Sequence, residues 1–190
     1  MLKTNLRKIY LSKQQTLSSS ERLNMSLRIG ESFFRKFELK TVNFLHTFLS
    51  IEKNGEIETS FVYEKVWINL PKIITLIPRV NFEKNTIESL EFNKETQLFK
   101  NRWQIPEPIA GKSIEAKKID VILVPLLCFD ENGFRVGYGK GFYDKFLKTC
   151  RADCLKIGLS YFLPEKEISD SNENDVRLNY CLTPDKMYEF

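Results

Sequence analysis

The chain has 190 residues, a net charge of +4 and four cysteines. This length suits one domain with a substantial core, so we expect a single domain over residues 1–190. Lys and Arg are interleaved with Asp and Glu, which argues against a nucleic-acid-binding module, and the longest apolar run, around 119–129, is too short to span a bilayer. We therefore expect neither a nucleic-acid nor a membrane partner.

The cysteines do not have the spacing of a metal site or a redox motif. They stand alone without a C-x-x-C pair, and His46 is the only histidine, so few ligands remain for zinc. The N-terminus has no apolar core of a secretory signal. We expect a cytoplasmic protein with reduced, structural cysteines, and a monomer.

The N-terminal segment is predicted to be an amphipathic helix, because apolar residues recur at helical spacing at Leu2, Leu6, Ile9 and Tyr10. Lys3 and Arg7 are four residues apart and share one helix face. On the sequence alone, a solvated basic face is the favoured interpretation of this pair.

A second helix is predicted to begin at residues 18–21, Ser-Ser-Ser-Glu, which have the pattern of a capping box. Its predicted core face consists of five apolar residues: Leu23, Leu27, Phe33, Phe34 and Phe37.

Residues 42–50 are rich in β-formers and predict a buried strand in which His46 is a satisfied core residue. The loop at 51–59 follows, at a strand end where open α/β sheets bind ligands. Further segments are predicted in chain order: a helix at 61–68, a strand at 72–78, two short strands within 86–100, a stiff loop at 101–108 and strands at 155–161 and 180–183.

The middle of the chain has the order strand, glycine loop, helix. An apolar run at 121–124 ends at Pro125, and a polar turn at 130–133 comes before three glycines at alternate positions, Gly137, Gly139 and Gly141. Apolar residues then repeat at helical spacing through residue 147. Glycines let the backbone approach a ligand closely, and the N–H groups that open a helix attract anions.

Charged residues strengthen the prediction of an anion site. Arg135 and Lys140 supply two cations, and Asp144 lies on the first helical turn, where a carboxylate could hold magnesium against phosphates. The spacing matches neither a Walker A loop, which needs Ser or Thr after Gly-Lys, nor a dinucleotide fingerprint. The alternative is a tight turn before a helix. Strands separated by helices predict an α/β fold, a three-layer sandwich with a largely parallel central sheet and helices on both faces.

Residues 135–144, Arg-Val-Gly-Tyr-Gly-Lys-Gly-Phe-Tyr-Asp, resemble the signature of the 5-formyltetrahydrofolate cyclo-ligase family, also called 5,10-methenyltetrahydrofolate synthetases. The preceding Leu-Val-Pro-Leu-Leu-Cys-Phe-Asp-Glu-Asn-Gly, Glu-Ile-Glu-Thr at 56–59 and Asn-Glu-Asn-Asp at 172–175 are similar to other family segments. The family's fold is an α/β sandwich of the kind predicted above.

The resemblance implies an ATP-dependent ligase of folate one-carbon metabolism. Its substrates would be ATP, with Mg²⁺, and 5-formyltetrahydrofolate, including polyglutamylated forms. Lys140 and Arg135 would be catalytic, with Lys140 at the γ-phosphoryl group. The nucleotide would contact eight residues: Lys3, Arg7, Arg135, Gly137, Gly139, Lys140, Gly141 and Tyr143.

The resemblance also implies a folate pocket formed by Glu58, Trp103, Tyr138, Phe142 and Tyr143. Glu58 would accept hydrogen bonds from the pterin ring and Trp103 would stack on it. Without the resemblance, Glu58 is equally an acid at a helix N-terminus, and Trp103 is equally a core residue.

Asp144 and Asp175 would bind the magnesium ion, although the residues around Asp175 also fit a polar turn. Two other classes of function stay open at this point. One is an ATP-independent sugar-phosphate isomerase or transferase relative, and the other is a non-catalytic folate- or nucleic-acid-binding protein. An ATPase assay with and without folate separates them.

Overall fold

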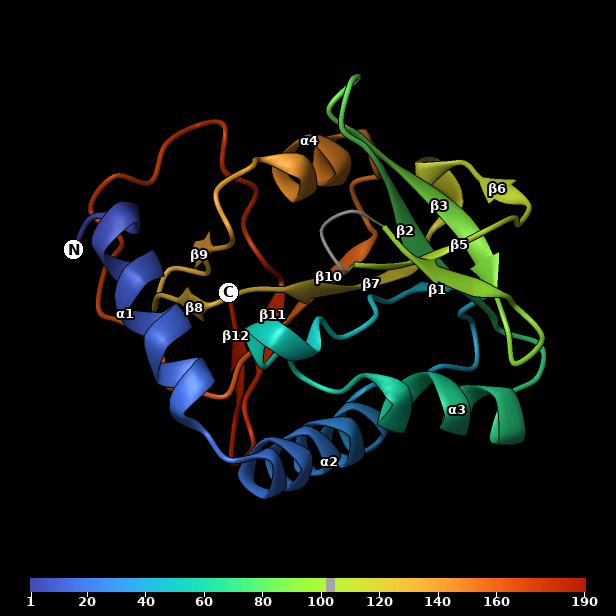
Figure 1. The fold of residues 1–190 in the computed structure, drawn as a ribbon, viewed down its shortest axis with the longest axis horizontal. Coiled ribbons are helices and arrows are strands. Elements are labelled where there is room, and N and C mark those ends of the chain that lie inside the picture. Colours follow the sequence, from blue (N-terminus) through green and yellow to red (C-terminus); the bar gives the residue numbers. More distant parts are fainter. Residues whose placement is uncertain (102–104) are drawn as a thin grey trace.

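The computed structural model describes residues 1–101 and 105–190. Its centre is an eight-stranded sheet with the strand order β12-β11-β10-β7-β1-β2-β3-β6 (Figure 1). The strands of this sheet have the following bounds: β1 Phe44–His46, β2 Ile74–Asn81, β3 Thr86–Phe92, β6 Ser113–Ile114, β7 Val121–Pro125, β10 Leu155–Leu159, β11 Tyr180–Leu182 and β12 Met187–Glu189.

The five middle strands, β11, β10, β7, β1 and β2, are parallel, and the outer strands β12, β3 and β6 pair antiparallel. In the register of the central strand, Leu45 lies opposite Val121 on one side and Thr75 on the other. The parallel strands therefore have neighbouring strands along both edges, and a parallel sheet of this kind also needs cover on both of its faces.

Helices cover the two faces of the sheet (Figure 1). On one face, α2 (Ser19–Lys36) and α3 (Ser60–Asn69) bury Ile29, Phe33 and Val62 against the strands. On the other face, α4 (Phe142–Thr149) buries Phe146 and Leu147. The predicted three-layer α/β architecture is confirmed.

The first helix, α1 (Lys3–Thr16), packs beside a small two-stranded sheet formed by β8 (Cys128–Phe129) and β9 (Arg135–Val136). Its buried stripe is Leu6, Tyr10 and Gln14, whereas Leu2 and Ile9 from the predicted apolar face are exposed. The remaining elements are β4 (Leu98–Lys100), which pairs with β5 (Pro106–Pro108), and two short 3-10 helices at Glu52–Asn54 and Ala116–Lys118.

The capping box of α2 is confirmed, because the Ser18 and Glu21 side chains each accept a backbone hydrogen bond from the other residue. The predicted core face of this helix was partly wrong, since Leu23 and Leu27 are exposed. Gly30 packs so closely on α3 that a Cβ there would lie 3.0 Å from the Phe61 Cβ. The face of α2 that contains Gly30 packs against α3, because a small residue permits this close approach. Leu23 and Leu27 lie on the outer side of the helix as a result.

The structure refines three strand predictions. The central strand is shorter than 42–50, because only Phe44–His46 pairs with neighbouring strands. Two strands do lie within 86–100, but in different sheets, since β3 pairs with β2 and β6, and β4 pairs with β5. The predicted last strand is followed by β12, which turns back beside β11 after a loop that contains Pro184.

His46 is a fully buried core residue, as predicted, but it is not a satisfied one. Its ring packs against Phe146, with 5.0 Å between the ring centroids, and neither ring nitrogen has a hydrogen-bond partner among the described residues. Burial lowers the pKa of His46 to about 3, so the ring is neutral at physiological pH.

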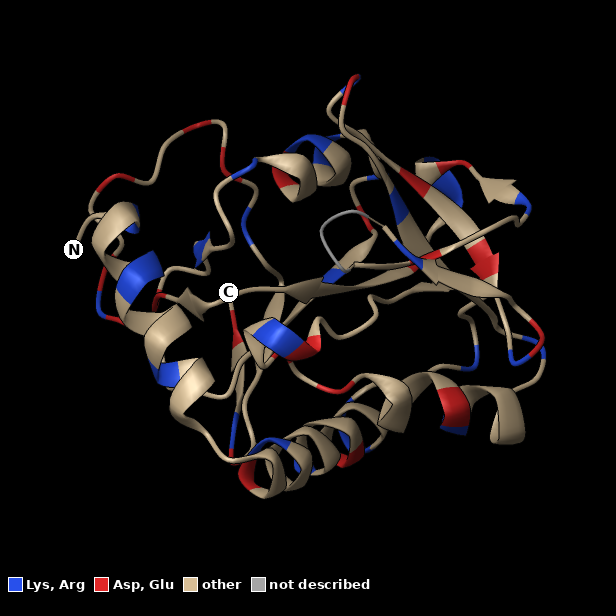
Figure 2. Cartoon of the chain, viewed as in Figure 1, with Lys and Arg blue, Asp and Glu red and all other residues tan. Residues whose placement is uncertain are grey.

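All four cysteines are unpaired. Among the described residues, no helix is both long and apolar enough to cross a membrane. Positive side chains lie on helices, strands and loops and are mixed with negative ones (Figure 2), which continues the interleaving seen in the sequence.

Candidate active site

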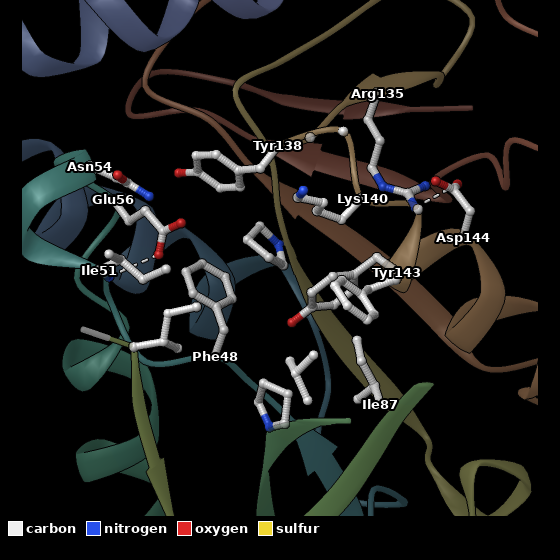
Figure 3. A pocket seen from close by; sticks show the side chains of 18 of the residues that line it. Phe48, Ile51, Asn54, Glu56, Ile87, Arg135, Tyr138, Lys140, Tyr143 and Asp144 are labelled. Atoms are coloured by element: carbon white, nitrogen blue, oxygen red, sulfur yellow. Dashed lines mark hydrogen bonds and ion pairs between the residues drawn. The ribbon is translucent and has the colours of Figure 1, made fainter. Parts of the chain in front are cut away.

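A cavity of about 560 Å³ lies at the carboxyl ends of the parallel strands. Pro125 at the end of β7 and Phe48 just after β1 contribute to it, together with Pro78 and Val80 of β2. The glycine loop closes one side, and the loop that follows β1 closes the other (Figure 3). Its size lies in the range of small-molecule and cofactor sites.

The glycine loop runs from β9 into α4 and approaches the cavity with its backbone. Gly139 and Gly141 have φ angles of +88° and +70°, a region that side chains disfavour. A Cβ on Gly139 would lie 2.9 Å from the guanidinium carbon of Arg7, and the Arg7 Nε donates to the Gly137 carbonyl at 2.9 Å. The loop conformation and the position of Arg7 therefore depend on each other.

Arg135 is almost fully buried beside the loop. Its guanidinium donates to the Asp144 carboxylate at 2.8 Å and to the Val176 carbonyl at 2.5 Å. Burial lowers the pKa of Arg135, and the Asp144 carboxylate opposes that shift. The ion pair fixes the Arg135 guanidinium near the start of α4, where Figure 3 shows it beside the cavity.

A second ion pair lies on the same side, where the Lys3 ammonium contacts the Asp175 carboxylate at 2.5 Å. Lys140, in contrast, has no hydrogen bond or ion pair with any described residue, and its side chain extends into the middle of the cavity (Figure 3). Lys140 is therefore a cation that no carboxylate neutralises in this structure.

Glu56 forms the opposite wall (Figure 3). One carboxylate oxygen accepts the Ile51 backbone N–H at 2.9 Å, and the Tyr138 side chain lies on the same side of the cavity (Figure 3). Glu56 is half-buried, and the part that is exposed faces the cavity. Burial raises the pKa of Glu56 to about 7, and the neighbouring Tyr138 side chain and the Ile51 N–H oppose the shift.

Between these two walls the cavity is mostly apolar. Phe48, Val80, Ile87 and Phe142 line it, and Phe142 packs edge-on against Phe82 with 5.4 Å between the ring centroids. The hydroxyl of Tyr143 is buried in this lining without a partner among the described residues. An unpaired buried hydroxyl costs free energy, so a ligand that hydrogen-bonds to it regains that cost.

The cavity brings together all but two of the predicted site residues: Lys3, Arg7, Arg135, Gly137, Tyr138, Gly139, Lys140, Gly141, Phe142, Tyr143, Asp144 and Asp175. Glu58 does not line it. Its carboxylate accepts the Ser60 N–H at 3.0 Å at the start of α3, and it borders an adjoining groove. Trp103 lies outside the described residues, so its predicted stacking role stays a prediction.

The two predicted metal ligands meet one chemical requirement of a magnesium site. In both Asp144 and Asp175 a single oxygen accepts all the hydrogen bonds from described residues. The other carboxylate oxygen of each remains available, and Mg²⁺ prefers oxygen ligands. The described residues contain no group of three or more His, Cys, Asp or Glu that would hold a metal without such help from a ligand.

Comparison with known proteins assigns the family. Residues 1–184 match the model of the 5-formyltetrahydrofolate cyclo-ligase family. The chain belongs to that family. A 5-formyltetrahydrofolate cyclo-ligase of Escherichia coli strain K12 is 30% identical over 146 residues, which cover 75% of this chain and 79% of the relative. The Mus musculus enzyme of the same name is 28% identical over 155 residues, covering 78% and 74%.

Solved structures agree with this assignment. The NMR structure of Aquifex aeolicus 5,10-methenyltetrahydrofolate synthetase superposes with a TM-score of 0.78 at 27% identity, covering 100% of this chain and 93% of that one. The synthetase of Mycoplasma pneumoniae has the same fold, with a TM-score of 0.75 at 24% identity, covering 97% and 99%. The cyclo-ligase fold therefore extends over the whole chain.

Sequence reasoning missed Glu56 as a site residue. The residue belongs to the same Glu-Ile-Glu-Thr segment as Glu58, and only Glu56 of the two lines the cavity. One local signal was available. Ile57 is an apolar residue that is buried, so the side chains of the two acids beside it are expected to point away from the core. This pattern does not say which of the two acids faces the cavity.

Proposed function

We propose that this chain is a 5-formyltetrahydrofolate cyclo-ligase that converts 5-formyltetrahydrofolate and ATP into 5,10-methenyltetrahydrofolate, ADP and phosphate. The observation that carries the proposal is the single cavity in which the cationic glycine loop faces the Glu56 carboxyl. The family match over residues 1–184 supports it. The isomerase and binding-protein alternatives lose their ground, because the matched family consists of ligases.

The chemistry explains why both walls are needed. The formyl oxygen of the substrate is a poor leaving group until the γ-phosphoryl group of ATP is transferred to it. The N10 amine of the same molecule then attacks the formyl carbon, the bond to the phosphorylated oxygen breaks and phosphate leaves. Ring closure is intramolecular, so the protein accelerates it mainly by orientation and needs no covalent nucleophile.

The glycine-loop wall is proposed to bind ATP. Lys140 would contact the γ-phosphoryl group, since its ammonium lines the cavity and has no hydrogen bond or ion pair with any described residue (Figure 3). Arg135, Arg7 and Lys3 would neutralise the other phosphate oxygens, and the backbone N–H groups of the loop would donate to them. Asp144 and Asp175 would hold Mg²⁺, which supplies further neutralisation of phosphate charge when it is bound.

The opposite wall is proposed to bind the pterin. Glu56 replaces Glu58 as the carboxylate that accepts hydrogen bonds from the pterin amino group and ring N–H, because only Glu56 lines the cavity. Tyr138 lines the same side of the cavity as that carboxylate (Figure 3). Tyr143 and Phe142 complete the apolar sides of the pocket, and Tyr143 offers its unpaired hydroxyl to the substrate.

A neighbouring groove of about 580 Å³ supports acceptance of polyglutamylated folate. It shares Lys53, Glu56 and Pro106 with the cavity, and Arg22 and Lys100 add cations along it. A glutamyl tail leaving the pterin pocket would follow this groove. The comparison that tests this point is the KM for mono- and polyglutamylated substrate in Lys100→Ala and in the wild type.

The proposed reaction is tested by absorbance. Purified protein is mixed with 5-formyltetrahydrofolate and magnesium-ATP, and the methenyl product is followed spectroscopically, with ATP or folate omitted in the controls. Product that requires both substrates, with ADP formed in equal amount, supports the proposal. ADP formation without folate, or isomerisation of a sugar phosphate without ATP, would replace it.

A further inference from the structure

The buried stripe of α1 ends on a polar residue. Leu6 and Tyr10 belong to an apolar cluster with Val136 of β9, and Gln14 follows one turn later on the same face of the helix. The Gln14 side chain is as inaccessible as its apolar neighbours, since the residue is only 3% exposed. A buried amide costs free energy unless its polar atoms are paired, so the partners of Gln14 indicate what the amide does.

The Gln14 amide binds the loop that carries Glu56. Its Nε2 donates to the Asn54 carbonyl at 2.8 Å, and the same nitrogen lies 3.5 Å from the Tyr138 hydroxyl. Asn54, Glu56 and Tyr138 all line the cavity, and Figure 3 shows them together on one side of it. Gln14 does not line the cavity. It therefore supports the Glu56 side of the cavity from behind.

Residues 51–56 form a compact turn that is closed by its own hydrogen bonds. The Asn54 N–H donates to the Ile51 carbonyl at 2.9 Å, and the Ile51 N–H donates to the Glu56 carboxylate at 2.9 Å. Gly55 lies directly against α1, where a Cβ would be 3.1 Å from the Gln14 carbonyl oxygen. Because the carboxylate is bonded within the turn, its position in the cavity depends on where the whole turn is held.

Hydrogen bonds from outside the turn hold it in place. Gln14 holds it on the α1 side, and the Tyr161 hydroxyl donates to the Glu56 carbonyl at 3.1 Å. Gln15 also contacts the turn, but its amide reaches the Lys53 carbonyl only at 3.5 Å and its side chain is exposed. Water can replace an exposed hydrogen bond at little cost, whereas a buried one leaves its partner unpaired when it is lost. On the α1 side, the Gln14 bond is thus the one that matters.

We propose that Gln14 is a positioning residue for 5-formyltetrahydrofolate, which places the Glu56 carboxylate for the pterin by holding the Asn54 carbonyl. The inference rests on the proposed function and adds to it a residue that touches neither substrate. The nucleotide should be unaffected, because the glycine loop has a separate attachment to the same helix, the bond of 2.9 Å from the Arg7 Nε to the Gly137 carbonyl.

Gln14→Met tests the proposal, because methionine keeps a long unbranched side chain and has no donor. At pH 8 the KM and the Kd for 5-formyltetrahydrofolate should rise about 3- to 10-fold, the usual effect of losing one buried hydrogen bond. The kcat and the KM for ATP should stay at the wild-type values. Gln15→Met is the matched control on the same helical turn and should behave like the wild type.

Gln14→Glu is the second variant and decides the question if Gln14→Met does not fold. It keeps the shape of the side chain but turns an acceptor toward the Asn54 carbonyl, so its folate affinity should fall at least as far. Circular dichroism checks that each variant is folded.

Two further measurements separate positioning from a general loss of structure. In a Glu56→Gln background, Gln14→Met should add less than about twofold to the KM for the folate, because residues that act through one contact are not additive. Hydrogen exchange is measured on the ligand-free protein. The amides of residues 51–56 should exchange faster in Gln14→Met than in Gln15→Met, and those of the glycine loop should not.

Equal folate affinity in the wild type and a folded Gln14 variant would overturn the proposal. The same holds for a fully additive loss in the Glu56→Gln background, or for equal exchange of the 51–56 amides in Gln14→Met and Gln15→Met. Failure of the proposed function would look different, because calorimetric titration of the wild type would then show no binding of 5-formyltetrahydrofolate.

Discussion

The two walls of the cavity bind by different physical means. The glycine-loop wall presents basic side chains, with Lys140 free of hydrogen bonds to described residues and Arg135 held against Asp144. The facing wall presents a single carboxyl group, Glu56, whose pKa burial raises to about 7. One wall is thus suited to an anion, and the carboxyl group on the other changes its hydrogen-bonding character within the physiological pH range.

This difference separates the two substrates. An anionic ligand gains most from a fixed cation and from backbone N–H groups, because neither has to change protonation on binding. A neutral heterocycle with N–H donors gains from an ionised carboxylate, and its binding then shifts the proton equilibrium of Glu56. Changes on one wall should therefore affect one substrate and leave the other nearly unaffected.

The largest effect is expected for Lys140→Ala. Removing this ammonium, which has no hydrogen bond or ion pair with a described residue (Figure 3), should lower kcat by about 100- to 1,000-fold, the usual loss when a group that stabilises transition-state charge is removed. Lys145→Ala is the matched control, because Lys145 is exposed on the next turn and does not line the cavity. Turnover of Lys140→Ala within a few-fold of the control would remove Lys140 from the mechanism.

Glu56→Gln should raise the KM for 5-formyltetrahydrofolate by about 10- to 100-fold, because an amide cannot accept two donors as a carboxylate does, a loss of about 1–3 kcal/mol. The KM for ATP should change little. Glu58→Gln tests the choice between the two neighbouring acids and should behave like the wild type. The opposite ranking of the two variants would return the pterin contact to Glu58.

The pH dependence follows from the raised pKa of Glu56. In the free protein the carboxyl is protonated below a pH of about 7, and substrate donors need the ionised form. The KM for the folate should therefore increase about tenfold between pH 8 and pH 6, since each unit below the pKa costs a factor of ten. Glu56→Gln should give a flatter profile over this range. His46 does not contribute, since its pKa is about 3.

The smallest effect concerns the backbone of the glycine loop. Gly139→Ala and Gly141→Ala should each lose about 1 kcal/mol of unfolding free energy, because both glycines have positive φ. Only Gly139→Ala should also raise the KM for ATP by a few-fold, because its methyl group would displace the Arg7 guanidinium. Denaturant unfolding and initial rates measure the two effects. If the KM for ATP is the same in Gly139→Ala and Gly141→Ala, Arg7 does not contribute to ATP binding.

The features that could be predicted from sequence depend on short stretches of chain. The capping box at Ser18, the α4 helix after the glycine loop and the shared face of Lys3 and Arg7 each follow from spacing within one turn or loop. The residues that line the glycine-loop wall could be named from the sequence because most of them lie within residues 135–144. Lys3 and Arg7 come from α1 and were found by their four-residue spacing.

The features that were missed depend on which distant element packs nearby. Leu23 and Leu27 match a core pattern, yet α3 approaches the small residues of α2 instead. The same limit applies to Glu56 and Glu58, because only the folded position of the loop after β1 decides which acid faces Tyr138. His46 shows the remaining limit, since no sequence pattern reveals that its ring lacks a hydrogen-bond partner.

The most direct test of the two-wall account is calorimetric titration of each substrate separately. A non-hydrolysable ATP analogue with magnesium, and 5-formyltetrahydrofolate, would each be titrated into wild type, Lys140→Ala and Glu56→Gln at pH 8. The account predicts that Lys140→Ala weakens only the nucleotide and Glu56→Gln weakens only the folate. Loss of both ligands in either folded variant, or loss of the wrong ligand, would contradict it.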